Sequence, residues 1–174
     1  ILADDPAKLA LREDDPALRS AQRGLLLAGQ LVAWAPKAQR ELLLVSPYFV
    51  PGRSGVASLA ALEHQGVQVR VLTNSLAATD EPLVHIGYQR YRVPMLRLGV
   101  ELHELSPVRA GRSKRLGAIF SRSIGRLHAK TAVIDRRQVF IGSMNFDPRS
   151  EKHNTEMGLF IDSPQLAREM LRLM

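Results

Sequence analysis

Hydrophobic positions along the chain alternate between a period of two and a helical period, so strands and helices are expected to alternate. Val67, Val69 and Val71 alternate with polar residues, which is typical of a strand. Residues 42–45 form a short apolar run before "SPYFVPG", which predicts a buried strand that leads into a loop. In chain order, the patterns predict a helix over 16–35, a strand over 42–45, a helix over 54–65, a strand from 67 to "TNS", a helix over 80–98, a strand over 100–105, two strands within 125–145, a strand over 154–161 and a helix that begins at 163–164.

This order of elements indicates an α/β fold in layers, because helices that alternate with strands cover the faces of a sheet. The last three predicted strands come without long helices between them, so we expect a mixed sheet. A chain of 174 residues suits a single domain over 1–174 with a substantial core. We expect residues 1–15, where little fixes the chain, to be poorly ordered or a linker.

The charge of the chain narrows the classes of partner. The formal net charge is +7, which favours nucleic acid, anionic lipid head groups or phosphorylated small molecules. Residues 107–126 hold six Lys or Arg and no acid, so this segment either contacts an anionic membrane or is a solvated loop. The sequence has no cysteine, which excludes disulfides and thiolate metal sites, and it has no apolar run long enough to span a membrane.

Four polar residues interrupt the two apolar stretches of "GRLHAKTAVIDRRQVFIGSMN", residues 125–145. Side chains alternate faces along a strand, so His128 shares a face with Lys130, and Ser143 shares a face with Asn145. In a hairpin symmetric about Arg136–Arg137, each member of one pair lies opposite a member of the other: Lys130 with Ser143, and His128 with Asn145. All four groups would then meet at the open end of the hairpin, and a shift of one residue in register would separate them.

Together the four groups have the chemistry of a site for a phosphoryl group. Lys130 offers a compact positive charge to phosphate oxygens, and Asn145 and Ser143 offer directional donors. The imidazole of His128 titrates near neutral pH, so it can attack phosphorus or transfer a proton. Glu156, in the next predicted strand, could orient this imidazole.

Each of these residues also has an ordinary structural explanation when taken alone. A single strand histidine is more often structural than catalytic, and a single lysine is usually a solvated surface group. Ser143 and Asn145 could be turn residues, and Glu156 could be an exposed position of an alternating strand. Asp135 is typical of the first position of a turn, which places it at the hairpin tip and away from the cluster. The convergence of the polar groups is what favours the phosphoryl site.

The spacing of the cluster resembles a known motif. Its fixed positions read His128-x-Lys130-x4-Asp135-x6-Gly142-Ser143-x-Asn145. This pattern resembles the complete HKD motif of the phospholipase D superfamily, and Glu156 stands where that family commonly has an acidic residue that hydrogen-bonds the motif histidine. Within roughly residues 42–162, four stretches resemble the C-terminal half of bacterial cardiolipin synthases: "SPYFVP", "GVQVRVLTNS", "VHIGYQRYR" and "GVELHEL".

The resemblance implies a phospholipase D-like layered α-β-α domain with a mixed central sheet, and chemistry without a metal or other cofactor. In the family, one histidine attacks phosphorus and forms a phosphohistidine. A second histidine protonates the leaving alkoxide and then activates the incoming alcohol or water, while two lysines and two asparagines bind the nonbridging oxygens. The cluster agrees with this chemistry, because it lacks the set of carboxylates that would hold Mg²⁺.

The resemblance also implies a role for each motif residue. His128 is expected to be the general acid/base, with nucleophile as the alternative. The other positions divide into phosphate-binding Lys130, Ser143 and Asn145, and the motif positions Asp135 and Gly142, which we expect to be structural.

The sequence departs from the family in holding one HKD motif where the family site needs two. The remaining histidines lack a lysine two residues later: His64, His85, His103 and His153. A single cluster cannot both attack phosphorus and protonate the leaving group from the opposite side. We therefore expect residues 1–174 to be the second half of a longer two-motif chain, with a homodimer as the alternative source of the second motif. An isolated half should be nearly inactive.

The leading hypothesis is a phosphatidyltransferase of phospholipid metabolism, similar to cardiolipin synthases, that acts on phosphatidylglycerol or a similar lipid. The alternatives are a hydrolase that releases phosphatidic acid, a phosphodiesterase or nuclease, and a non-catalytic lipid-binding half-domain. The resemblance outside the motif favours lipid over nucleic acid, and it implies a peripheral protein on the cytoplasmic side of the bacterial inner membrane. Tyr48 and Phe49 could wall a lipid pocket or pack in the core, and His85 could contact a head group or belong to a packed helix face.

Overall fold

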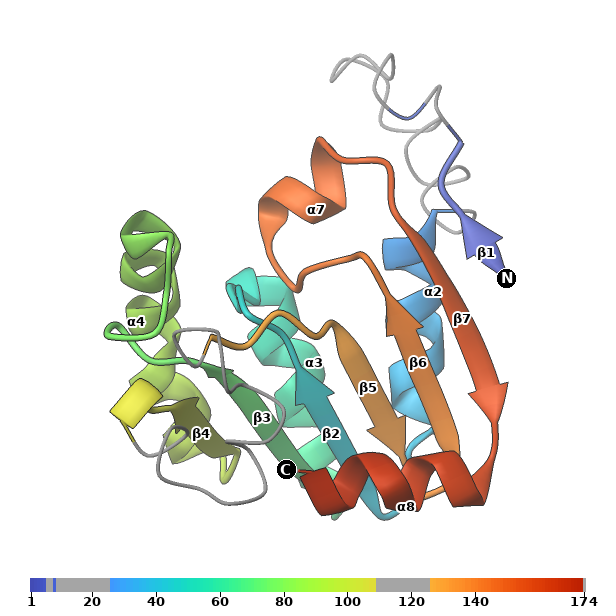
Figure 1. Cartoon of the computed structure of the whole chain (residues 1–174). Coiled ribbons are helices and arrows are strands. Elements are labelled where there is room, and N and C mark those ends of the chain that lie inside the picture. Colours follow the sequence, from blue (N-terminus) through green and yellow to red (C-terminus); the bar gives the residue numbers. More distant parts are fainter. Residues whose placement is uncertain (6–7, 9–25, 109–125, 174) are drawn as a thin grey trace.

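The computed structural model describes residues 1–5, 8, 26–108 and 126–173. In this part of the chain seven strands form one sheet in the order β1-β7-β6-β5-β2-β3-β4, with helices on both faces (Figure 1). The strands are β1 Leu2–Ala3, β2 Glu41–Val45, β3 Gln68–Asn74, β4 Glu101–Leu105, β5 Thr131–Ile134, β6 Gln138–Gly142 and β7 Met157–Asp162. The helices are α2 Leu27–Trp34, the 3₁₀ turn η2 Ala35–Lys37, α3 Gly52–His64, α4 Pro82–Arg97, α7 Pro148–Lys152 and α8 Pro164–Leu173.

The sheet has a parallel half and an antiparallel half, which confirms the predicted mixed α/β fold. Strands β2, β3 and β4 are parallel because α3 and α4 carry the chain back between them. Strands β5 and β6 pair as a hairpin, and β7 returns antiparallel to β6. Because β5 also pairs antiparallel with β2, this hairpin joins the two halves at the centre of the sheet.

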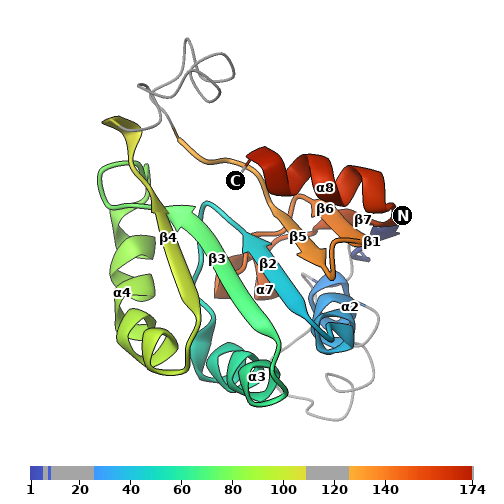
Figure 2. The ribbon, with the colours of Figure 1, turned by 90° about the horizontal axis from the view of Figure 1, so that it is seen from below.

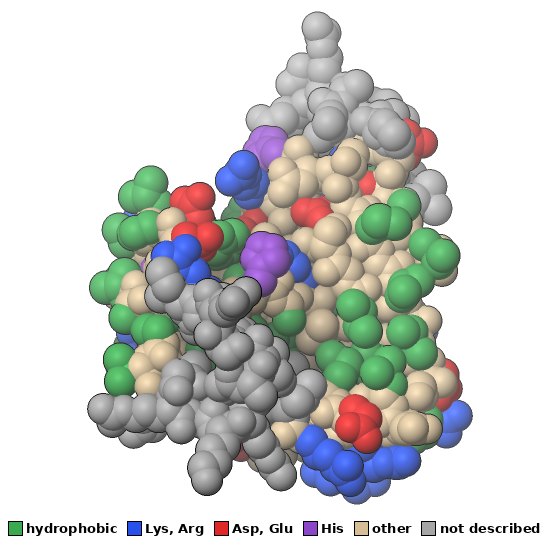
Figure 3. Space-filling view, in the orientation of Figure 1, with side chains coloured by type: hydrophobic (Ala, Val, Ile, Leu, Met, Phe, Trp, Pro, Cys, Tyr) green, Lys and Arg blue, Asp and Glu red, His purple; other side chains and the backbone are tan. Residues whose placement is uncertain are grey.

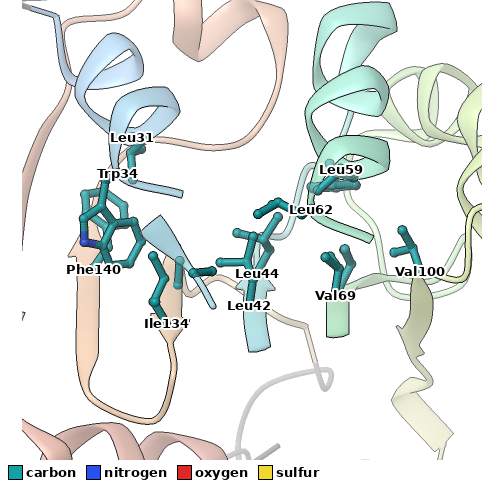
Figure 4. Close-up of a cluster of buried hydrophobic side chains, with 14 of the residues drawn as sticks. Leu31, Trp34, Leu42, Leu44, Leu59, Leu62, Val69, Val100, Ile134 and Phe140 are labelled. Carbon is teal, nitrogen blue, oxygen red and sulfur yellow. The ribbon is translucent and has the colours of Figure 1, made fainter. Parts of the chain in front are cut away.

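Alternate residues of the central strands pack into two hydrophobic clusters. Leu42 and Leu44 of β2 belong to the cluster that contains α2 and α3, whereas Leu43 and Val45 pack in the cluster beneath α8. Figure 2 shows α2, α3 and α4 on one face of the sheet and α8 on the other. Figure 4 shows the larger cluster, with these labelled members: Leu31, Trp34, Leu42, Leu44, Leu59, Leu62, Val69, Val100, Ile134 and Phe140. Burial of each such side chain stabilises the fold by roughly 1.5–3 kcal/mol, so the strands that lead to the site are held by a well-packed core.

The register of the β5–β6 hairpin differs by one residue from the predicted one. Val133 lies opposite Val139, and both face α8. The predicted pairing of Lys130 with Ser143 is therefore wrong, because the carbonyl of Lys130 instead accepts the N–H of Gly142 at 3.1 Å. The same shift separates the other predicted pair, and the motif histidine and lysine lie just before β5 rather than within it.

The shift originates in the hairpin turn. Asp135 and Arg136 have positive φ angles of 51° and 55°, and the N–H of Arg137 donates to the carbonyl of Ile134 at 2.9 Å. Two consecutive left-handed residues form the tight turn whose twist suits a pair of antiparallel strands. The turn thus comprises Asp135, Arg136 and Arg137, so its centre falls at Arg136 rather than between Arg136 and Arg137.

The first residues of the chain belong to the edge of the sheet. Strand β1 pairs antiparallel with β7, and the buried Asp4 forms an ion pair of 2.6 Å with Lys8. The carboxylate of Asp4 also accepts the backbone N–H groups of Leu27 at 2.7 Å and Glu156 at 3.1 Å. The described residues 1–5 and 8 thus pack against the edge of the sheet, and the rest of the range 1–15 lies outside the described residues.

Side chains cap the first turns of α7 and α8. Ser163 caps α8 at the predicted helix start, since its Oγ accepts the N–H of Leu166 at 3.2 Å. Helix α7 was not predicted, and Asp147 caps it by accepting the N–H of Ser150 at 2.8 Å. Of the helix predicted over 16–35, the structure shows α2, Leu27–Trp34, and residues 16–25 lie outside the described residues.

Candidate active site

One edge of the sheet gathers the residues of the predicted cluster. Strands β2 and β3 are parallel, so their carboxyl ends lie together, and β5 runs antiparallel to β2, which brings its amino end to the same edge. The same alternation places the carboxyl end of β6 and the amino end of β7 there (Figure 1). The candidate site lies where residues 126–130 lead into β5 and residues 143–156 connect β6 to β7.

His128 and Lys130 are in direct contact. Nζ of Lys130 lies 3.1 Å from Nε2 of His128 and donates to the His128 carbonyl at 2.9 Å. The histidine is exposed, whereas the lysine is half-buried. A charged ammonium group only donates, so in this contact the lone pair of Nε2 accepts from Lys130. When Lys130 donates to another acceptor instead, the exposed imidazole can transfer a proton or attack an electrophile.

The charge of Lys130 is balanced by its surroundings. Burial lowers the pKa of Lys130, because an ammonium group loses hydration when it is partly enclosed. The negative charges of Glu156 and Asp80 oppose this effect, although the pKa stays below its ordinary value. The site therefore combines one partly enclosed cation with two carboxylates close enough to stabilise its charge.

Glu156 orders Ser143. The glutamate is buried, and its carboxylate accepts a hydrogen bond from Oγ of Ser143. The same Oγ accepts the N–H of Met157 at 3.0 Å, so the hydroxyl is fixed from both sides. This geometry differs from the expectation that Glu156 orients the imidazole of His128: the histidine contacts Lys130, and Glu156 acts on Lys130 through its charge.

Asn145 carries an unpaired polar atom. Its Oδ1 is buried and has no hydrogen-bond partner among the described residues, while its backbone N–H donates to Oγ of Ser150 at 3.3 Å. Buried amide groups are normally paired, so this oxygen is an exception among the described residues. A half-turn of the amide exchanges its oxygen and nitrogen, so it can meet either a donor or an acceptor.

Asp135 lies at the opposite end of β5 from His128 and ties the hairpin to β2. Its carboxylate accepts the backbone N–H groups of Gln39, Arg40 and Glu41 at 3.0, 2.9 and 3.0 Å. Partial burial acts to raise the pKa of Asp135, but these donors outweigh it and hold the pKa below its usual value. Asp135 therefore holds the hairpin turn against the start of β2.

Gly142 lies beneath the ring of Phe140, where a side chain has no room. A Cβ at this position would come within 2.6 Å of Cζ of Phe140 and 2.6 Å of the carbonyl oxygen of Met157. Gly158, which lies opposite in β7, is covered by the same ring. Packing alone therefore requires glycine immediately before Ser143.

Tyr48 and Asp80 form a polar pair next to the cluster, although the sequence indicated Asp80 only as the start of the helix predicted over 80–98. The phenol donates to Oδ1 of Asp80 at 2.7 Å. Burial, together with this hydrogen bond and the charge of Asp80, raises the pKa of Tyr48 to about 12. The same hydrogen bond lowers the pKa of Asp80, and the nearby Arg126 and His128 lower it further. Asp80 follows the carboxyl end of β3, and the ends of such strands often carry sites in α/β proteins, but its closeness to His128 depends on the arrangement of the sheet.

Phe49 and His85 pack in the core. They are 2% and 4% exposed, and their rings lie against Phe146 and Tyr88 with centroid separations of 6.2 and 5.5 Å. They line a cavity of about 10 Å³, which has room for about one water molecule. For both residues the structure thus shows the packing alternative rather than a lipid pocket or a head-group contact.

Comparisons with known proteins extend this picture. The family model described as "Cardiolipin synthase, PLD-like domain" matches residues 31–174. The chain belongs to this family. Membership confirms the resemblance to the phospholipase D superfamily on which the motif analysis relied.

Individual relatives support the same family and fold for this PLD-like domain. Cardiolipin synthase C of Escherichia coli (strain K12) is 47% identical over 165 residues, which cover 93% of this chain and 35% of that protein. The phospholipase D family member Nuc from Salmonella typhimurium has a TM-score of 0.61 at 18% identity, covering 83% of this chain and 81% of that one. Phosphatidylserine synthase from Haemophilus influenzae has a TM-score of 0.54 at 17% identity, covering 79% and 31%. The PLD-like domain spans about a third of the length of cardiolipin synthase C and of two further curated relatives.

Proposed function

We propose that this PLD-like domain is the second catalytic half of a phosphatidyltransferase of phospholipid metabolism, similar to cardiolipin synthases. The observation that carries the proposal is the contact of the exposed His128 imidazole with Nζ of Lys130, at the sheet edge where Asn145 holds an unpaired polar atom. Family membership and the 47% identity to cardiolipin synthase C support lipid phosphodiesters as the substrate class.

In the proposed reaction, a histidine of a second HKD half attacks phosphorus and forms a P–N bond. His128 gives its proton to the departing alkoxide oxygen as the P–O bond breaks. It then takes a proton from the hydroxyl of the incoming glycerol head group, whose oxygen displaces the first histidine from phosphorus. Lys130 and Asn145 bind the nonbridging oxygens while charge redistributes. The reverse assignment, with His128 as the nucleophile, is the alternative.

Ser143 and Glu156 have a supporting place in this proposal. The hydroxyl proton of Ser143 is engaged by Glu156, so direct binding of phosphate by Ser143 requires that bond to open. Lys130 and Asn145 need no such rearrangement. The negative charge of Glu156 favours the protonated form of Lys130, which is the form that binds phosphate.

The second HKD half needs a docking surface beside the site, and an uncovered apolar surface lies there. Ile141, Met157 and Leu159 are 37%, 57% and 39% exposed, and they share the face of β6 and β7 that α8 covers further along. Figure 3 shows hydrophobic side chains on this side of the molecule. We place residues 1–174 as one domain of a longer two-motif chain, with the other half on this surface; a second copy of the chain is the alternative occupant.

A second exposed surface suits an anionic membrane. Helix α4 exposes aliphatic and basic side chains on its outer side: Leu83, Ile86, Val93, Leu96, Arg90 and Arg97 (Figure 3). The helix contains no acidic residue, and such a face is typical of contact with anionic lipid. None of the described helices is both long and apolar enough to cross a bilayer.

We therefore propose peripheral binding through α4 at the cytoplasmic side of the bacterial inner membrane. The basic segment 107–126 is proposed as a further contact, and most of it lies outside the described residues. A chain of net charge +7 is attracted to the anionic membrane surface that would hold its substrate.

A lipid-transfer assay tests the proposal. The full-length protein is incubated with labelled phosphatidylglycerol and phosphatidylethanolamine in vesicles, and His128→Ala is compared with His153→Ala, which alters another exposed histidine. Diphosphatidyl product that disappears in His128→Ala and persists in His153→Ala supports phosphatidyl transfer. Equal loss in both variants would overturn the assignment of His128.

The remaining outcomes separate the alternative functions. Phosphatidic acid as the sole product would establish the hydrolase, which differs only in using water as the acceptor. Cleavage of DNA but of neither lipid would establish a nuclease. Binding to the vesicles without any product would favour the non-catalytic lipid-binding half-domain.

A further inference from the structure

Asn74 clamps the backbone next to His128. It is the last residue of β3, and it is 3% exposed. Its Oδ1 accepts the N–H of Leu127 at 2.9 Å, and its Nδ2 donates to the carbonyl of Leu127 at 3.1 Å. Both backbone polar groups of the residue before the histidine are therefore paired with one side chain.

The clamp takes the place of a neighbouring strand. Strand β5 pairs with β2 as far as Thr131 and Val45, where β2 ends and the chain leaves in "SPYFVP". Asn74 reaches the preceding segment, residues 126–130, from the next strand along, β3. An amide carries a donor and an acceptor with the spacing of a peptide group, which among neutral side chains only Asn and Gln offer.

Two further contacts hold the chain, one after His128 and one before it. The carbonyl of Lys130 accepts the N–H of Gly142 at 3.1 Å, so the backbone is fixed two residues beyond His128. The side chain of Leu127 packs against the cluster beneath α8. Between these anchors His128 is exposed, so its direction depends on the backbone that carries it.

We infer that Asn74 is a positioning residue, which sets the backbone from which His128 presents its imidazole to the phosphate. The kinetic part of this inference rests on the proposed function, whereas the clamp itself can be tested without turnover. Misplacement of a catalytic group by about 1 Å costs on the order of 10²-fold in rate. Since the amide of Asn74 is buried and engaged by Leu127, its loss should lower kcat about 10- to 100-fold and leave KM within about twofold.

Thr73 supplies a matched control. It precedes Asn74 in β3, it is also 3% exposed, and its Oγ1 donates to the carbonyl of Pro47 at 3.4 Å. Nδ2 of Asn74 lies 3.5 Å from the same carbonyl. Thr73→Val and Asn74→Ala thus both remove a buried polar contact with Pro47, and only Asn74→Ala also releases Leu127.

The test uses the full-length protein with isotope-labelled histidine. For the wild type, Thr73→Val and Asn74→Ala, kcat, KM and the thermal midpoint are measured together with the imidazole resonances, and His128→Ala identifies the resonance of His128. Both variants should lower the midpoint, and only Asn74→Ala should lower kcat and shift or broaden the His128 resonance.

Two results would overturn the inference: an unchanged His128 resonance in Asn74→Ala, or an equal loss of kcat in Thr73→Val. A protein that turns over no lipid would refute the proposed function, while the His128 resonance would still decide whether Asn74 positions the imidazole.

Discussion

Replacement of Gly142 by alanine tests whether packing explains the motif glycine. The new Cβ would lie 2.6 Å from Cζ of Phe140, 2.6 Å from the carbonyl oxygen of Met157 and 3.2 Å from Cα of Gly158. Two of these atoms belong to the backbone of β7, so a change of rotamer cannot relieve all three contacts. An added methyl group in a well-packed site costs about 1–3 kcal/mol, and the rigid backbone neighbours favour the upper half of that range.

For a domain of this size, about 2–3 kcal/mol corresponds to a fall in Tm of roughly 4–12 °C. Thermal unfolding followed by circular dichroism or calorimetry measures it. Gly87→Ala is the control, because its Cβ would meet only methyl carbons of Val50 at 3.4 and 3.5 Å. Glycine inside a helix costs roughly 0.5–1 kcal/mol relative to alanine, so Gly87→Ala should leave Tm unchanged or raise it.

A Gly142→Ala protein as stable as the wild type would refute this reasoning, since the clash would then be absorbed without cost. A variant with full stability and no activity would refute it in a different way. It would mean that Gly142 is needed at the substrate rather than beneath Phe140.

Three further substitutions probe the charges of the site and the hairpin. Asp135→Ala removes the acceptor of three backbone N–H groups and should lower the free energy of unfolding by about 1–2 kcal/mol at neutral pH, as does loss of a helix cap. Because the folded-state pKa of Asp135 is depressed, the difference in unfolding free energy between wild type and variant should be complete above about pH 4 and shrink as the pH falls through the folded pKa. Urea unfolding at neutral pH and again below the folded pKa measures this difference, and a difference that stays constant contradicts the reasoning. Glu156→Gln removes a charge that raises the pKa of Lys130, so the alkaline limb of the pH–activity profile should move to lower pH, and a limb that stays in place argues against Lys130 as its origin. Asp80→Asn should lower the pKa of Tyr48 from about 12, as measured by ultraviolet titration of the phenol; an unchanged value would show that burial alone raises it.

Elements with a strong local pattern were predictable, whereas the hairpin register was not. Strand β3 shows the period of two because Val69 and Val71 are buried while Gln68 is exposed. The register of β5 and β6 depends instead on which two residues adopt positive φ. Arg136 is not a residue type that signals such a conformation, so the sequence offered no reason to centre the turn on it.

The composition of the site was predictable from residue types and spacing, but its pairings were not. Polar groups at the ends of two strands indicated a phosphate-binding edge, and the structure brings the segments that carry them to one edge of the sheet. The sequence favoured His128 as the partner of Glu156, whereas the three-dimensional arrangement pairs Glu156 with Ser143. Asp80 comes close to His128 because β3 leads to this edge, a relation that no local pattern contains.

The contacts of Asp4 bear on how a longer protein of this family can be divided into parts. Its carboxylate joins the start of α2 at Leu27 to the backbone of Glu156, and its partner Lys8 donates to the carbonyl of Ser150 at 3.1 Å. A fragment cut downstream of these residues would leave the N–H groups of Leu27 and Glu156 without their acceptor. Separately expressed or exchanged halves should therefore be cut upstream of Leu2. A half that keeps the first strand also keeps the contact of Asp4 with the backbone of Glu156, whose charge favours the protonated form of Lys130.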